Sequence, residues 1–273
     1  MEELTKEELI QTPKKKHRWI FMVYSVLCIL SIINCVIYVS PNSVYLCLTL
    51  CIYWVLFLLF RALRIPLAVF FIVGIVLYLF ISFYLGIIVY VGVTYRHPWQ
   101  YEKEMATYRQ YEQYVSYFPE TIPDCATDVS LQIFTGMWQA KSYINLSFTA
   151  DDAYLQECKE KHMEWFYEYE DIDPKGLPDY ALSDWMEVAC VDLYPPYEKE
   201  LNRLYTTGAM QVLSISEEEA HNQIIQWLLP HNVRLTKEEL RSARQYHICE
   251  SQGQGFIIVE DTNRIIFYKD NEH

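Results

Sequence analysis

The hydrophobic positions are concentrated in the first third of the chain. No charged residue occurs between Arg18 and Arg61, nor between Arg64 and Arg96. A bilayer core of roughly 30 Å needs about 20 apolar residues in a helix, whereas a helix of a soluble protein normally keeps a polar face. The pattern therefore predicts a membrane unit at 19–92 with three transmembrane helices, over residues 19–39, 44–63 and 65–92.

Turn-forming residues set the limits of these predicted spans. Ser40-Pro41-Asn42-Ser43 separates the first span from the second, because four such residues in a row disfavour a continuous helix. The third span begins at Ile65-Pro66, where proline is tolerated in the first turn of a helix.

The basic residues predict how the chain is oriented. Cytoplasmic flanks of membrane helices carry an excess of Lys and Arg. This rule predicts a cytoplasmic N-terminal tail at 1–18, and three crossings then make the C-terminal region extracytoplasmic. We therefore expect a multi-pass protein of the cell membrane with the lipid bilayer as its first partner. The basic flanks are Lys14, Lys15, Lys16 and Arg18 before the first span, and Arg61 and Arg64 before the third.

After the apolar third, residues 93–117 have the pattern of an interfacial segment followed by a stem helix. Tyr95 and Trp99 are aromatic residues of the kind found at membrane interfaces. Five later positions, three or four residues apart, predict one helical stripe against a globular body. They are Tyr101, Met105, Tyr108, Glu112 and Val115.

Residues 118–273 have the mixed pattern of a soluble, acidic α+β domain. Alternating positions predict strands, and turn formers between two apolar runs predict a hairpin. Capping residues predict the starts of the helices. Strands are expected at 128–134, 142–148 and 186–193, a hairpin at 255–260 and 264–269, and helices at 150–170, 195–204, 217–229 and 236–246.

The charge of the C-terminal part excludes one class of partner. Residues 93–273 hold 15 Lys and Arg against 31 Asp and Glu, a net charge of −16. Such a surface repels the phosphate backbone of nucleic acids. We therefore expect no nucleic-acid partner, whereas a protein partner in the cell envelope remains open.

The cysteines divide evenly between the two parts of the chain. Cys28, Cys35, Cys47 and Cys51 lie in the first two predicted spans and are expected to pack as small apolar residues. An even number in an extracytoplasmic domain permits disulfides, with three alternative pairings. The candidates for a bridge are Cys125, Cys158, Cys190 and Cys249.

One acidic loop has the beginning of a calcium-binding pattern. Asp171 and Asp173 stand at the first and third positions, with glycine at the sixth. Lys175 replaces the expected Asp or Asn, and Leu182 replaces the bidentate glutamate. Asp171 and Asp173 are therefore only weak candidates for metal ligands, and a solvated acidic loop is the alternative.

The helix expected at 150–170 carries a group of aromatic residues. Trp165, Tyr167 and Tyr169 form either a binding surface, through stacking or cation–π contacts, or part of the core. Core packing is the commoner role for aromatic residues at helical spacing. The broad apolar face of this helix is predicted to consist of Leu155, Cys158, His162, Trp165, Phe166 and Tyr169.

No catalytic or cofactor motif is present in the sequence. There is no Walker motif, no G-x-S-x-G, no H-E-x-x-H and no complete dinucleotide fingerprint. The sequence thus predicts no catalytic residue and no cofactor. It favours a membrane-anchored extracytoplasmic module for binding, sensing or protein interaction. An envelope enzyme with a site assembled from scattered residues, and an accessory subunit of a membrane transport complex, are the alternatives.

One short stretch resembles a known group of proteins. Tyr117–Pro123, followed by Ala126–Val129, is similar to uncharacterised membrane-anchored proteins of Gram-positive clostridia. The resemblance extends to a closing hairpin like Gly255–Tyr268, and Cys125 departs from it. It implies a bacterial envelope setting and brings no activity or site residues.

Overall fold

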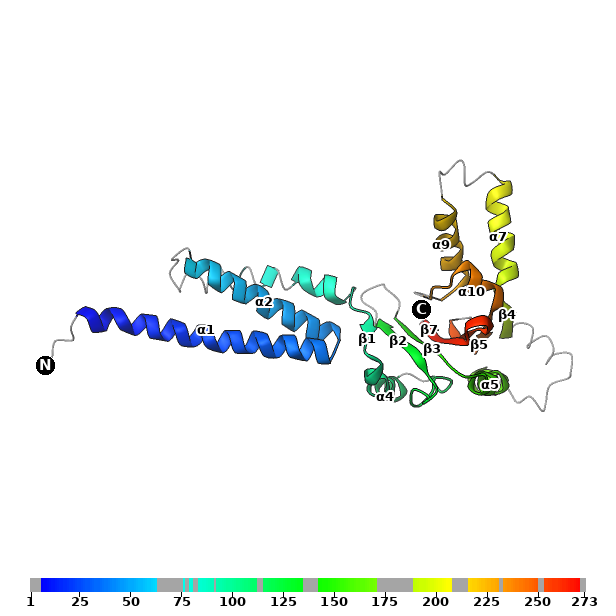
Figure 1. Ribbon diagram of the computed structural model, residues 1–273, viewed down its shortest axis with the longest axis horizontal. Coiled ribbons are helices and arrows are strands. Elements are labelled where there is room, and N and C mark those ends of the chain that lie inside the picture. Colours follow the sequence, from blue (N-terminus) through cyan, green and yellow to red (C-terminus); the bar gives the residue numbers. More distant parts are fainter. Residues whose placement is uncertain are drawn as a thin grey trace. The chain divides into compact units, whose positions relative to one another are not determined.

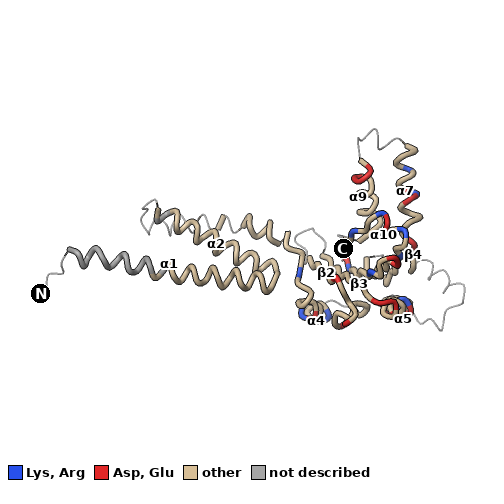
Figure 2. Tube along the Cα trace, in the orientation of Figure 1, with Lys and Arg blue, Asp and Glu red and all other residues tan. Residues whose placement is uncertain are grey.

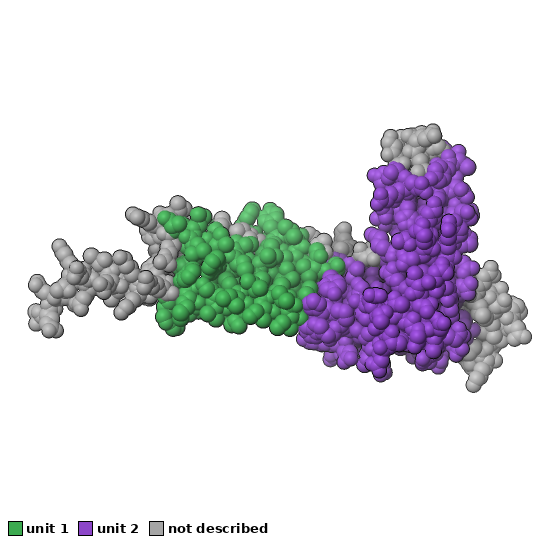
Figure 3. All heavy atoms as spheres, in the orientation of Figure 1, with its two compact units in different colours: residues 1–94 green, residues 95–273 purple. Residues whose placement is uncertain are grey.

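The chain divides into two compact units, Met1–Thr94 and Tyr95–His273 (Figure 3). The structure is a computed structural model, and each unit is described by itself. The described residues are 6–62, 76, 79–80, 83–90, 92–111, 115–134, 142–170, 189–207, 216–230, 233–249 and 253–270.

Unit 1 contains a helical hairpin made of α1 (Lys6–Ile37) and α2 (Pro41–Ala62) (Figure 1). The ring of Phe21 stacks on Trp54 with centroids 5.9 Å apart, and Trp54 Nε1 donates a hydrogen bond to Ser25 Oγ at 3.0 Å. Cys28, later in α1, hydrogen-bonds through Sγ to the carbonyl of Leu50, which is earlier in α2, at 3.4 Å, so the helices run antiparallel. Figure 2 shows that the hairpin has no charged residue over most of its described length.

The predicted break at Ser40–Ser43 is present, and α2 begins inside it. Ser40 N donates to Ser43 Oγ at 3.0 Å, and Ser43 N donates to Ser40 Oγ at 3.1 Å. This reciprocal pair occupies amide groups that a helix start leaves without partners. Pro41 then fits the first turn, where no donor is required.

The prediction of three transmembrane helices is wrong. Among the described residues, one segment is long and apolar enough to cross a bilayer, Pro41–Leu59, and 11% of it is buried. The apolar part of α1, Phe21–Ile37, is shorter than this segment. The rest of α1 begins at Lys6 and belongs to the charged N-terminal tail. Most of the third predicted span, 65–92, lies outside the described residues.

Unit 2 is built on a seven-stranded antiparallel sheet. The described part of the chain therefore combines an α+β unit with one helix of membrane-spanning length. The strand order is β1-β2-β3-β7-β6-β5-β4. The strands are β1 (Tyr95–Arg96), β2 (Thr127–Phe134), β3 (Tyr143–Thr149), β4 (Cys190–Asp192), β5 (Ala243–His247), β6 (Gln254–Val259) and β7 (Arg264–Asp270).

Helices cover the sheet on both sides. Figure 1 shows α5 on one side and α7, α9 and α10 on the other. Their placement follows from the central strands, because β6 and β7 are apolar on both faces and need cover on both. The helices are η1 (Pro98–Gln100), α4 (Tyr101–Tyr111), α5 (Asp152–Glu170), α7 (Tyr194–Thr206), α9 (Glu217–Leu228), α10 (Lys237–Ser242) and η3 (Glu260–Thr262).

The first core lies between the sheet and the helices α4 and α5. Tyr101 and Met105 of α4 are fully buried there, and Tyr108 packs against the same cluster. The predicted stripe at the start of the C-terminal part is therefore present, but it belongs to unit 2 rather than to a separate stem. The other buried members include Leu131, Ile133, Ile144, Leu146, Phe148, Leu155, Cys158, Phe256, Ile258, Ile265 and Phe267.

The second core lies on the opposite face, under α7, α9 and α10. The N-cap predicted at Ser216 and the capping box predicted at Thr236 both form: Ser216 accepts from the Glu219 amide at 3.1 Å, and Thr236 from the Glu239 amide at 3.2 Å. The core contains Leu193, Tyr197, Leu201, Ala220, Ile224, Ile225, Leu240, Ile257, Val259, Ile266 and Tyr268, among others.

The helix predicted from Thr236 to residue 246 is too long. α10 ends at Ser242, and β5 begins at Ala243. Ala243 pairs with Val259, and Tyr246 pairs with Phe256. Long-range strand pairing thus overrides a local sequence that is compatible with helix.

Candidate functional site

The sheet face that carries the second core changes from apolar to polar between β7 and β3. Ser147 pairs with Ile266 on one side and with Ser130 on the other, and Asn145 pairs with Gln132. Directly paired residues share a face, so β2 and β3 present hydroxyl and amide groups beside the apolar rows of β6 and β7.

A groove of about 330 Å³ lies over this polar half of the face. We call it the polar groove. Its volume falls at the lower end of the range for small-molecule sites, which is roughly 300–1,000 Å³. The lining residues come from β2, β3, β7 and the segment between α9 and α10; they are Asp128, Ser130, Gln132, Asn145, Ser147, Val233, Arg234, Arg264 and Ile266.

Asp128 lies at the end of the groove where β2 bulges. Thr127 pairs with Thr149 and Ser130 with Ser147, so three steps on β2 face two steps on β3. The backbone of Asp128 has φ +52°, in the left-handed region that few residues other than glycine adopt. Bulges of this kind are frequent beside functional sites, where they redirect a side chain.

The two arginines of the groove differ in their surroundings. Arg264 Nη1 donates to Glu239 Oε1 at 2.9 Å. Partial burial raises the pKa of Glu239, but hydrogen bonds from Thr236 and Arg264 lower it overall. Arg234 is exposed; it donates to the Val233 carbonyl at 3.1 Å and forms no ion pair with any described residue.

The segment that carries Arg234 is fixed to the helices above it. Val233 and Leu235, on either side of Arg234, are buried in the second core. His221 of α9 hydrogen-bonds through Nε2 to the Leu235 carbonyl at 3.1 Å and through Nδ1 to the Tyr197 hydroxyl at 3.1 Å. The arginine therefore extends from an ordered support, as a binding residue requires.

A buried polar network adjoins the groove floor, because Asn145 pairs with Tyr268. The Tyr268 hydroxyl accepts from Gln245 Nε2 at 2.9 Å and lies 3.2 Å from His247 Nδ1. Burial, with a smaller effect from His162, lowers the pKa of His247 to about 4. Because His247 is only 3% exposed, the network serves packing and offers no surface for a substrate.

A second hollow, of about 350 Å³, lies at the start of α7. Its charges largely have partners within the protein. Arg244 Nε lies 2.7 Å from Asp192 Oδ1, and Glu260 pairs with Lys159 at 2.6 Å. The guanidinium of Arg241 lies 5.9 Å from the ring centre of Tyr194. This hollow is therefore a weaker candidate for a binding site than the polar groove.

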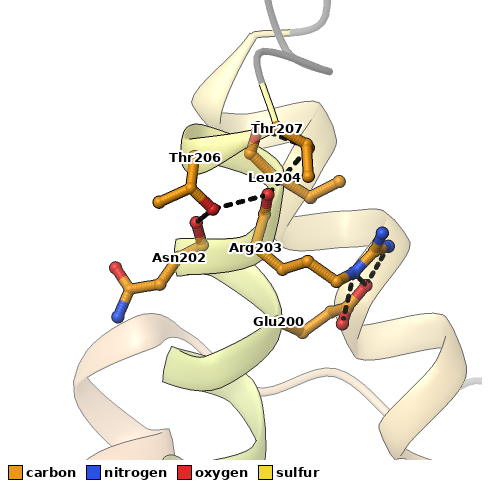
Figure 4. Close-up of polar contacts among 6 residues, drawn as sticks. All are labelled: Glu200, Asn202, Arg203, Leu204, Thr206 and Thr207. Carbon is orange, nitrogen blue, oxygen red and sulfur yellow. Dashed lines mark hydrogen bonds and ion pairs between the residues drawn. The ribbon is translucent and has the colours of Figure 1, made fainter.

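The polar contacts at the end of α7 also stay within one element (Figure 4). Glu200 pairs with Arg203 one turn later, and Thr206 and Thr207 return hydrogen bonds to carbonyls of the same helix. They complete the last turn of α7.

The structure separates the aromatic residues predicted as a binding surface. The ring of Trp165 meets Phe256 edge-on at 6.0 Å, and Trp165 and Tyr169 pack against the first core. Tyr167 instead contacts Phe166 at 6.2 Å. Because the three do not share one face, they form part of the packing rather than a platform.

The structure joins none of the four candidate cysteines by a disulfide bond, and the two candidate metal ligands are not among the described residues. The four cysteines lie on four separate segments, and no disulfide bond links any two of them; they are Cys125, Cys158, Cys190 and Cys249. Burial raises the pKa of Cys158 to about 12, as expected for a packing residue. Asp171 and Asp173 lie outside the described residues, and no group able to hold a metal ion occurs among the residues described.

The polar groove has no signature in the sequence. The alternating pattern of β2 and β3 indicates which positions are polar. It does not indicate that no described helix packs over those positions. No protein-family model, curated protein or solved structure matches the chain.

Proposed function

We propose that the protein is a membrane-anchored binding module, in which unit 1 holds the chain in lipid and unit 2 takes a small polar ligand in the polar groove. The observation that carries the proposal is the groove itself. Hydroxyl, amide and charged side chains converge there, on a sheet face that the neighbouring helices do not cover. Ligand sites commonly combine such a hollow with a few polar groups that fix orientation.

The apolar surface of unit 1 supports the anchoring role. Only 11% of the Pro41–Leu59 segment is buried, and Leu46, Val55 and Leu59 are each at least half exposed. Val26, Ile29 and Val36 of α1 are also at least half exposed. Apolar surface of this extent requires cover, and lipid provides it without any further protein.

We further propose that unit 2 faces the outside of a bacterial envelope, as the resemblance to the clostridial proteins implies. Its strongly acidic charge supports this placement, because the cytoplasmic leaflet is rich in anionic lipids and repels such a surface. Protease added to intact cells should digest unit 2. Digestion only after the cells are broken would refute the placement.

Ligand binding is tested with the full chain in lipid nanodiscs. We expect saturation-transfer NMR of mixed neutral sugars, amino acids and hydroxy acids to detect at least one binder. Ser147→Phe fills the groove floor and should abolish the saturation-transfer signal of the bound compound. Glu160→Phe, on the exposed side of α5, should leave the signal unchanged. Absence of any binder, or a signal that survives Ser147→Phe, would refute the role of the groove.

A further inference from the structure

We infer that the polar groove selects a zwitterionic ligand, an amino acid or short peptide, whose carboxylate pairs with Arg234 and whose ammonium group pairs with Asp128. The inference rests on the proposed binding role of the groove and adds the chemical class of its ligand.

The first observation is that two opposite charges in one hollow have no partner among the described residues. Asp128 and Arg234 both line the groove as exposed residues, and neither forms an ion pair with the other or with any described side chain. This separates the polar groove from the second hollow, where Asp192 and Arg244 neutralise each other at 2.7 Å. A ligand that carries both charges would form an ion pair with each of the two residues. A simple anion would be repelled by Asp128, and a simple cation would be repelled by Arg234.

The second observation is the backbone of Asp128. Its left-handed conformation, at φ +52°, lies within a bulge of β2 at the groove. Apart from glycine, Asp and Asn are the residues that adopt this conformation most readily, so the bulge suits an aspartate at this position. Placing a carboxylate at the rim of a binding groove gives the bulge a function.

The third observation is the chemistry between the two charges. Ser130, Ser147 and Asn145 line the floor with hydroxyl and amide groups, which can donate to and accept from peptide groups. Arg264 adds little net charge, because Glu239 lies 2.9 Å from it. Arg234 thus remains the cation available to a carboxylate, with the fork geometry that this group matches.

Size favours a small ligand of this class. A groove of about 330 Å³ is near the lower limit for drug-sized ligands. It suits an amino acid or a dipeptide better than a folded partner or a polymer.

The test compares three forms of one dipeptide on the full chain in nanodiscs, by isothermal titration calorimetry. Alanyl-serine carries both charges, its N-acetyl derivative lacks the ammonium group, and its C-terminal amide lacks the carboxylate. We expect the zwitterion to bind on the order of tenfold more tightly than either derivative, because each lost charged hydrogen bond weakens binding.

Two variants assign the charges to their residues. Arg234→Gln should weaken alanyl-serine on the order of tenfold and leave the amide unchanged. Asp128→Asn should weaken alanyl-serine similarly and leave the N-acetyl derivative unchanged. The matched controls, Arg241→Gln and Asp192→Asn, alter the second hollow and should change none of these affinities.

The outcomes separate this inference from the proposed function. Equal binding of the three peptides, or no binding of alanyl-serine, would overturn the inference. If other compounds bind and their saturation-transfer signal disappears in Ser147→Phe, the groove would still be a binding site, but not one selective for zwitterions. Weakening in the controls equal to that in Arg234→Gln and Asp128→Asn would also overturn the inference.

Discussion

Lowering the pH from 7 to 5 should destabilise unit 2 through His247. The ring is 3% exposed, and its Nδ1 lies 3.2 Å from the Tyr268 hydroxyl. That hydroxyl accepts from Gln245 Nε2, and its own proton is available to an unprotonated Nδ1. Protonation of Nδ1 would remove this acceptor and place a charge in a buried site.

The size of the effect follows from the pKa shift. Burial lowers the pKa of His247 from 6.5 to about 4. A folded-state pKa below the unfolded value gives stability that is present above pH 6.5 and is lost as the pH falls toward 4. At pH 5 the loss amounts to about 2 kcal/mol, from roughly 1.4 kcal/mol per pKa unit. This is a large part of a typical unfolding free energy of about 5–15 kcal/mol.

The measurement is urea unfolding of the full chain in mild detergent, followed by tryptophan fluorescence. His247→Gln retains a hydrogen-bond acceptor but does not titrate in this range. The unfolding free energy of the wild type should fall about 2 kcal/mol more than that of His247→Gln between pH 7 and pH 5. Some decrease should remain in the variant, because burial also lowers the pKa of His162. Equal decreases in the two proteins would refute the reasoning.

Three further predictions follow from packing, anchoring and the thiols. Gly255→Ala should lower the unfolding free energy by about 2 kcal/mol or more in the same assay, because its Cβ would lie 2.1 Å from the Tyr246 carbonyl; a neutral result would contradict this. Double substitution of Leu48 and Val55 by Lys should release the chain from membranes into carbonate extracts, since each charge costs about 3 kcal/mol within a bilayer; Tyr205→Lys, at an equally exposed position of unit 2, serves as the control. Mass spectrometry of unreduced peptides should find no disulfide bond among Cys125, Cys158, Cys190 and Cys249, and any bridged pair would contradict this.

Much of unit 2 could be predicted because its local signals agree with its long-range structure. Ser216 and Thr236 each stand three residues before a glutamate and start helices in the structure as expected. The final hairpin forms around Asn263, which adopts the left-handed conformation that such turns require. In both cases the determining contacts lie within a few residues.

The errors arise where distant contacts decide the outcome. Absence of charge between Arg18 and Arg61 indicated lipid-compatible helices, but it did not fix the apolar length of α1. β5 reads locally as helix and is a strand because β6 pairs with it. Helical spacing places His162 on the apolar face of α5, where the structure buries it, but its hydrogen bond to the His247 carbonyl at 2.8 Å has no local signal in the sequence.

The polar groove is a consequence of how the sheet is covered. β6 and β7 are apolar on both faces, so α9 and α10 must pack over them, and the segment between these helices then borders β3. On this face β2 and β3 carry polar side chains, which would lose their hydration under an apolar helix. No described helix packs over these side chains, and they line the polar groove. Arg234 belongs to the segment between α9 and α10, and Asp128 belongs to the bulge of β2. The requirement to bury β7 thus places two charges on separate elements around one hollow, an arrangement that neither element could produce alone.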